Sequence, residues 1–181
     1  MIDAFIDDII TLYTTRGSEH HGESVSQLEH AVQCAQHAEA EHADPSLIAA
    51  ALLHDIGHLL HKQGENAAER GIDTLHERIG SGYLARVFPP SVTEPVLLHV
   101  SAKRYIATIE PSYQALLSPS SVRSFHLQGG VMSDAEIAAF LAETYNQQAQ
   151  QVRRWDEQGK VGDAVLPTLE SYRPLLRSLA G

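Results

Sequence analysis

The segment Ala51–His61 (ALLHDIGHLLH) places three histidines and one aspartate within an otherwise apolar run. Such side chains are rarely buried alone, because an unpaired buried polar group costs several kcal/mol. A metal ion is a partner that adjacent histidine and aspartate side chains can share, and these groups suit iron, manganese and zinc. His58 follows His54 by one helical turn on the same face, where it can contact a bound ligand. The segment therefore predicts a buried, metal-binding helix, whereas the simpler interpretation is a helix whose histidines hydrogen-bond neighbouring groups.

Apolar residues recur at helical spacing along most of the chain, and the alternation typical of strands is absent. Helices are predicted at 2–14, from the capping box at 26–29, from Asp44–Pro45 into the central segment, at 73–87, from Pro95, from the capping box at 133–136 to Gly159, and at 172–179. The predicted loops are 15–24, 64–71, 118–121 and 128–130. The sequence thus predicts an all-α fold, and its 181 residues are enough for one domain, 1–181.

Charge and composition exclude several classes of partner. The net charge is −10, with 13 basic and 23 acidic residues, which argues against nucleic acid or an anionic membrane surface as a partner. A small anion remains compatible, because a metal cluster dominates its local field. No apolar run approaches the roughly 18 residues of a membrane span, and the acidic segment Met1–Asp8 lacks a signal-peptide n-region. A cytoplasmic protein is expected, and its single cysteine, Cys34, is expected to fill space in the core.

Imidazoles and carboxylates on the apolar helical faces form one candidate set: His30, His54, Asp55, His76, His99 and Asp156. One metal does not need six protein ligands and still leave positions for chemistry. Two metals bridged by Asp55 do leave positions open for water, oxygen or substrate. The chain also contains eleven histidines, an unusual number that favours a metal site.

These residues resemble the HD-domain superfamily, an all-helical, metal-dependent fold, and His76 and His99 resemble its two-metal branch. That branch contains both phosphohydrolases and oxygenases. Over nearly the whole chain, the sequence is similar to the mixed-valent diiron oxygenases that cleave 2-amino-1-hydroxyethylphosphonate, and more distantly to myo-inositol oxygenase. The motifs that carry this similarity are Gln27–His30, Ala51–His58, His99–Tyr105, Gln128–Gly130 and Trp155–Lys160.

The resemblance implies a helical bundle with a dinuclear site for two Fe ions, Fe(II)/Fe(III). One iron would be bound by His30, His54, Asp55 and Asp156. The second iron would share Asp55 and add His76 and His99.

The resemblance also implies a substrate site. His58, Lys103 and Ser121 match positions around the substrate phosphonate, and His58 and Lys103 are the candidate catalytic residues. Lys103 fits physically, because it follows His99 by one turn and an ammonium is a point charge suited to a phosphonate. Gln128 matches a neighbouring position, and Glu23 matches a loop acid that contacts the substrate amine.

One position departs from the family, which has a tyrosine three residues before that acid where this chain has His20. His20 either binds the open iron position or leaves the gating of the site different. Arg104 is expected to be structural, His61 to lie at the surface or outside the metal ligands, and His21 to have no special role.

We therefore expect an oxygenase that uses O2 to cleave the C–P bond of a small 1-hydroxyalkylphosphonate, with or without an amino or trimethylammonio group, releasing phosphate and a carboxylic acid. The first alternative is a two-metal HD phosphohydrolase that acts on a phosphate ester with manganese, iron or magnesium. The second alternative is a non-catalytic, metal-containing binding module. The sequence does not indicate an oligomeric state.

Overall fold

The computed structural model describes residues 1–181 and contains helices and no strand, so the all-α prediction is confirmed. The α-helices are α1 (Ile2–Arg16), α2 (Gln27–Ala40), α3 (Pro45–Leu53), α4 (Ile56–Leu60), α5 (His76–Leu84), α6 (Pro90–Ile109), α7 (Pro111–Gln114), α8 (Pro119–Leu127), α9 (Asp134–Ala142), α10 (Asn146–Gln158) and α11 (Arg173–Leu179). Two short 3-10 helices, η1 (Ala68–Arg70) and η2 (Leu169–Tyr172), complete the set. None of the helices combines the length and apolar character that crossing a membrane requires.

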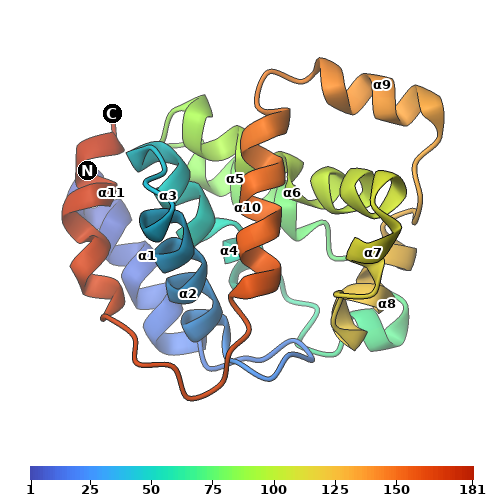
Figure 1. Ribbon diagram of the computed structural model, residues 1–181. Coiled ribbons are helices and arrows are strands. Elements are labelled where there is room, and N and C mark those ends of the chain that lie inside the picture. Colours follow the sequence, from blue (N-terminus) through green and yellow to red (C-terminus); the bar gives the residue numbers. More distant parts are fainter.

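The largest hydrophobic core contains 26 buried residues. Helix α10 packs against α6 and α2, and α3 packs against α2 and α6. Helix α11 packs against α1 and α3, so the two termini lie on the same side of the molecule (Figure 1). Phe5 and Leu176, from opposite ends of the chain, both belong to this core. We propose on this ground that residues 1–181 form one domain.

Helix α6 connects this core to the opposite side of the molecule, where α7, α8 and α9 lie (Figure 1). Its Val92 and Val96 belong to the large core, Leu98 belongs to a second cluster with α9 and α10, and Ile106 belongs to a third cluster with α7 and α8. This helix therefore fixes the distance between the main bundle and the small helices that close the far side.

The predicted continuous helix from 133 to Gly159 is wrong, because α9 ends at Ala142 and α10 begins at Asn146. Glu143 has an extended backbone conformation. The side-chain amide of Asn146 donates to the carbonyl of Leu141 at 3.2 Å and to that of Glu143 at 2.7 Å. The side chain thus satisfies carbonyl groups that a continuing helix would have bonded.

The predicted loop at 118–121 is also wrong, because α8 begins at Pro119. Ser118 is its N-cap, and its hydroxyl accepts a hydrogen bond from the backbone N–H of Ser121. This Ser–Pro start shares a first-turn proline with the correctly predicted Asp44–Pro45 start of α3, where the side chain of Asp44 makes no capping hydrogen bond.

Four other parts of the chain differ from prediction. Helix α6 begins at Pro90 and contains Pro95 within it, and α5 covers only the middle of the predicted helix at 73–87. The predicted loop at 64–71 contains η1. The central segment is not one helix, because α3 ends at Leu53 and α4 begins at Ile56, so His54 and Asp55 lie at the junction.

Candidate metal centre and its cavity

The structure brings the six candidate ligands together from five parts of the chain. His30 comes from α2, His54 and Asp55 from the α3–α4 junction, and the remaining three from α5, α6 and α10: His76, His99 and Asp156. Asp55 lies between two groups of nitrogens. Its Oδ2 atom is 3.7 Å from His30 Nε2 and 3.5 Å from His54 Nε2. Its Oδ1 atom is 3.3 Å from His76 Nε2 and 3.5 Å from His99 Nε2.

Asp156 adds a carboxylate to the first group only. Its Oδ1 atom is 3.4 Å from His30 Nε2, and its Oδ2 atom is 3.5 Å from His54 Nε2. The arrangement therefore has two compartments of unequal charge. The first compartment contains two imidazoles and the carboxylates of Asp55 and Asp156. The second contains two imidazoles and only the other oxygen of Asp55.

Backbone carbonyl groups determine which nitrogen of three histidines faces the centre. The Nδ1 atoms of His30, His54 and His99 lie 2.8, 2.9 and 2.6 Å from the carbonyl oxygens of Gly159, Ala51 and Val96. A carbonyl oxygen only accepts, so each Nδ1 carries the proton and each neutral ring presents a lone pair at Nε2. This is the second interaction that metal-binding histidines normally have.

The Nε2 atoms nevertheless face one another. Those of His30 and His54 are 3.3 Å apart, and those of His76 and His99 are 3.0 Å apart. Two acceptors cannot hydrogen-bond to each other, so His30 and His54 need a shared cation. Two donors about 2.1 Å from one octahedral metal are separated by about 3.0 Å at right angles. The spacing of these nitrogens and carboxylate oxygens fits two metal ions.

Electrostatics favour cations at the same positions. Burial would raise the pKa of Asp55, but the surrounding histidines, led by His54, lower it well below its usual range. Burial favours neutral His54, yet the adjacent Asp55 and Asp156 raise its pKa to about 9. Burial, assisted by His76, holds the pKa of His99 at about 4, although Asp55 opposes this. The carboxylates thus remain ionised and attract positive charge.

Two glycines allow this packing. A Cβ atom on Gly57 would lie 1.9 Å from the carbonyl oxygen of His76, so α4 and the start of α5 approach closely only because residue 57 has no side chain. A Cβ atom on Gly159 would lie 2.6 Å from Cys34 Sγ, beside the carbonyl that orients His30. Cys34 is fully buried, as expected of core filler.

A cavity of about 90 Å³ opens onto the centre, and few of its lining residues are hydrophobic. Lys103 lines it and is 4% exposed, with its ammonium group donating to Ser124 Oγ at 2.9 Å. Burial, assisted by Arg153, lowers the pKa of Lys103 to about 7. No carboxylate forms an ion pair with this ammonium group, so the cavity contains a buried cationic group that an anionic ligand would stabilise.

The other two basic residues of the cavity wall have carboxylate partners. The Arg153 guanidinium pairs with Asp156 and Glu157. Lys160 Nζ is 3.4 Å from both Glu23 Oε1 and Glu157 Oε1. These pairs support the wall, whereas Lys103 is free to interact with a ligand.

Five predicted substrate contacts line the cavity: Glu23, His58, Lys103, Ser121 and Gln128. Glu23 has protein partners that the sequence did not reveal, because Ser118 Oγ donates to it at 2.7 Å and Lys160 is nearby. Ser121 Oγ accepts from Lys160 Nζ at 3.0 Å, and Gln128 Oε1 is buried without a hydrogen-bond partner.

His20 does not line the cavity. It is exposed, and its backbone N–H donates to Glu65 Oε2 at 2.8 Å. The neighbouring His21 faces the cavity instead, with its ring centroid 4.7 Å from that of His58. Sequence reasoning therefore did not anticipate the position of His21, and whether it has a role stays untested. His21 has a left-handed backbone conformation (φ 47°), which spacing arguments do not anticipate.

Sequence reasoning also missed Lys160 and Glu77. Glu77 Oε2 is buried without a hydrogen-bond partner, 3.8 Å from His76 Nδ1, on the side where it would orient that ring. His61 is buried, at 6% exposure. Arg104 is structural as expected, since it donates to the carbonyl of Gly130 at 2.9 Å.

Comparison with known proteins agrees with this geometry. A family model described as the HD domain matches residues 28–134, which include five of the six candidate ligands. A hydroxymethylphosphonate dioxygenase of Gimesia maris is 42% identical over 96% of this chain and 87% of its own length. A [1-hydroxy-2-(trimethylamino)ethyl]phosphonate dioxygenase (glycine-betaine-forming) of Leisingera caerulea is 36% identical over 93% of this chain and 86% of its own length. The chain therefore belongs to the HD-domain family.

Proposed function

We propose that this protein is a diiron dioxygenase that uses O2 to cleave the C–P bond of a small 1-hydroxyalkylphosphonate, releasing phosphate and a carboxylic acid. The observation that carries the proposal is Lys103, a buried ammonium group without a carboxylate partner, which lines the same cavity as the metal-ligand set. A phosphonate provides the negative charge that this position lacks. The two related dioxygenases are named for hydroxyphosphonate substrates, which supports this substrate class.

Two iron ions are the proposed cofactor. His30, His54 and Asp156 would hold one, His76 and His99 would hold the other, and Asp55 would be a ligand shared by both. When bound, the irons would supply Lewis acidity toward the substrate oxygens and the redox chemistry that O2 requires. Imidazole and carboxylate donors suit iron, and the six donors leave open positions.

Oxidation makes this bond breakable at neutral pH. Direct hydrolysis would expel a carbanion, which is a poor leaving group. Oxidising the hydroxyl-bearing carbon breaks its C–H and C–P bonds, and one oxygen atom from O2 is gained by carbon and one by phosphorus. Hydroxymethylphosphonate plus O2 thus balances to formate plus phosphate.

The side chains of the cavity have distinct proposed roles. Lys103, assisted by Ser121, Gln128 and His58, would bind the phosphonate oxygens and orient the carbon toward the irons. Glu23 would lie near the other end of the substrate. Lys160 already neutralises the charge of Glu23, so a substrate with an uncharged end leaves Glu23 paired. A trimethylammonio group would instead compete with Lys160 for Glu23.

The test is phosphate release from iron-loaded protein, measured with and without O2. The substrates are hydroxymethylphosphonate and [1-hydroxy-2-(trimethylammonio)ethyl]phosphonate, and p-nitrophenyl phosphate serves as the ester control. The proposal expects phosphate from a hydroxyphosphonate only when O2 is present. Phosphate release from the ester under anaerobic conditions, with none from either phosphonate, would instead identify a phosphohydrolase. No turnover of any substrate by protein containing two irons would contradict an enzymatic role.

A further inference from the structure

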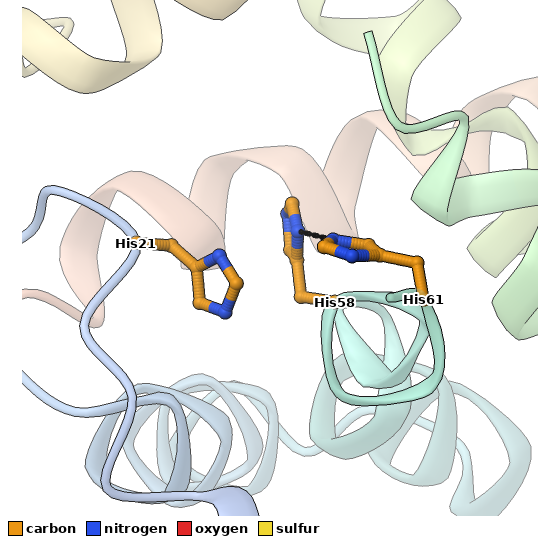
Figure 2. A group of neighbouring side chains, drawn as sticks. All are labelled: His21, His58 and His61. Carbon is orange, nitrogen blue, oxygen red and sulfur yellow. Dashed lines mark hydrogen bonds between the residues drawn. The ribbon is translucent and has the colours of Figure 1, made fainter. Parts of the chain in front are cut away.

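Three histidines, His21, His58 and His61, gather beside the candidate metal centre (Figure 2). His58 connects them to it, because its ring stacks on that of His76 with centroids 4.0 Å apart. The Nδ1 atom of His58 lies 3.4 Å from Nε2 of His61. No protein group lies within hydrogen-bond distance of Nε2 of His58, and the residue lines the cavity.

One backbone group determines the protonation pattern of this pair. The N–H of Gln63 donates to Nδ1 of His61 at 3.2 Å. A backbone N–H is always a donor, so His61 Nδ1 is an acceptor and the proton of the neutral ring lies on Nε2. His61 Nε2–H then donates to His58 Nδ1, which leaves the proton of His58 on its own Nε2 atom, the one without a protein partner.

The same logic excludes a third metal ion at this cluster. A histidine bound to a metal through Nε2 donates a hydrogen bond from Nδ1. In His61, Nδ1 accepts instead, so Nε2 is protonated and has no lone pair for a metal. A hydrogen-bonded pair is therefore the chemically consistent description of His58 and His61.

Contacts at the end of α4 fix the position of His61, and so maintain the direction of its hydrogen bond to His58. The Arg16 guanidinium donates to the carbonyl groups of Leu59 and His61. Arg16 also forms a two-point ion pair with Glu19, at 2.7 and 3.1 Å, and Glu19 lies 3.0 Å from His21 Nε2. Helix α1, the loop after it and the end of α4 are thus joined around the pair.

We propose that His61 is a positioning residue that fixes His58 with its proton on Nε2, so that His58 donates a hydrogen bond to the anionic group of the substrate. This inference rests on the proposed function, because it assigns His58 to the phosphonate oxygens. It makes His58 a hydrogen-bond donor to the phosphonate and not a base at Nε2. It also gives His61, which does not line the cavity, a defined effect on substrate binding.

The protonation pattern is tested without any turnover. Protein labelled with ¹⁵N-histidine and loaded with zinc, which is diamagnetic, is examined by long-range ¹⁵N–¹H correlation spectroscopy. The expected spectrum shows His58 and His61 both protonated at Nε2. A His58 ring protonated at Nδ1 would overturn the proposal, whatever reaction the protein catalyses.

Variants test the consequence for binding. His61→Gln keeps an amide N–H near the position of Nε2, whereas His61→Leu removes the donor. The probe is methylphosphonate, which lacks the hydroxyl group, and its dissociation constant is measured by titration of the zinc-loaded protein. We expect the dissociation constant to be about tenfold larger for His61→Leu, which means weaker binding. For His61→Gln it should change by no more than about twofold. The matched control is His126→Leu at an exposed histidine, with no expected change.

Kinetics on the iron-loaded enzyme add a second readout. A hydrogen bond present in both the bound substrate and the transition state changes KM and leaves kcat unaltered. We therefore expect His61→Leu to raise KM for hydroxymethylphosphonate with kcat within about twofold of the wild type. Equal binding by His61→Leu and wild type, at equal metal content, would overturn the proposal. If neither the wild type nor any variant turns over a phosphonate, the proposed function fails, while the zinc-protein measurements still decide the role of His61.

Discussion

Replacing Lys103 by methionine removes the only basic residue of the cavity wall that lacks a carboxylate partner. The two side chains have similar length, so the change removes the charge and largely preserves packing. Lys103 Nζ bonds only to the hydroxyl group of Ser124. The metal ligands do not include Lys103, so metal content should remain unchanged.

The expected loss in kcat/KM follows from the burial of Lys103. Lowering its pKa from the usual 10.5 to about 7 corresponds to about 5 kcal/mol of disfavoured charge in the empty cavity. A bound phosphonate compensates part of this free energy. Removing one partner of a desolvated charge pair costs roughly 2–5 kcal/mol, so kcat/KM for a hydroxyphosphonate should fall by about thirtyfold or more.

The pKa also predicts a pH dependence. Above pH 7 the free enzyme loses the charge on Lys103. The KM of the wild type should therefore increase with pH, and the increase should approach tenfold for each pH unit. Lys103→Met should lack this part of the pH dependence. In the metal-free folded protein, Lys103 binds fewer protons than in the unfolded chain between about pH 7 and 10.5. The buried charge of Lys103 therefore lowers the free energy of unfolding by its full amount below pH 7, and this destabilisation disappears as the pH rises through this range.

The assays are steady-state phosphate release between pH 6 and 9, metal analysis and thermal unfolding. At pH 7 the metal-free methionine variant should be more stable than the wild type, by up to about 4 kcal/mol. A kcat/KM within threefold of the wild type, at equal iron content, would refute the assignment of Lys103 to the phosphonate. An unchanged pH profile of KM would refute the charge argument specifically.

Four further substitutions, one of them with a matched control, test the candidate metal centre and the specificity of the cavity. Asp55→Ala should lose both irons and all turnover, and a variant that retained two irons per chain would contradict the bridging role. His76→Ala should lose one iron and keep the other, as measured by metal analysis. Gly57→Ala places a Cβ atom 1.9 Å from the His76 carbonyl oxygen and should lower Tm and iron content, whereas Gly82→Ala, with no atom within 4 Å, should gain up to about 1 kcal/mol in stability. Glu23→Leu should reduce efficiency on the trimethylammonio substrate by about ten- to a hundredfold and on hydroxymethylphosphonate only slightly; equal losses would mean that Glu23 only orders its loop.

The convergence of the candidate metal ligands was predictable because most of them lie on buried helical faces. His30, His76 and His99 each follow the spacing of apolar neighbours, so the helical period alone places them toward the core. Asp55 and His54 were predicted as a pair, although the reason was incomplete. They lie at a break between two helices, and this break allows Asp55 to face both groups of imidazoles.

The loops of the cavity were less predictable, because tertiary contacts determine where their side chains point. His20 and His21 are adjacent and chemically identical, and no sequence pattern separates them. The ion pair of Arg16 with Glu19 and the contact of Glu19 with His21 turn His21 inward, while His20 stays exposed. The hydroxyl group of Ser118 similarly attaches Glu23 to the start of α8.

Lys160 shows how one such contact connects the two ends of the cavity. Its ammonium group lies 3.4 Å from Glu23 Oε1, 3.0 Å from Ser121 Oγ and 3.7 Å from Asp156 Oδ1. One cation therefore joins the loop acid, a proposed phosphonate contact and a candidate metal ligand. A cationic substrate group at Glu23 would weaken the ion pair between Glu23 and Lys160. The ammonium group of Lys160 would then interact more strongly with Ser121 and Asp156. We therefore propose that the charge of the substrate's far end would affect Asp156, a candidate metal ligand, through Lys160, although Glu23 itself contacts no candidate ligand.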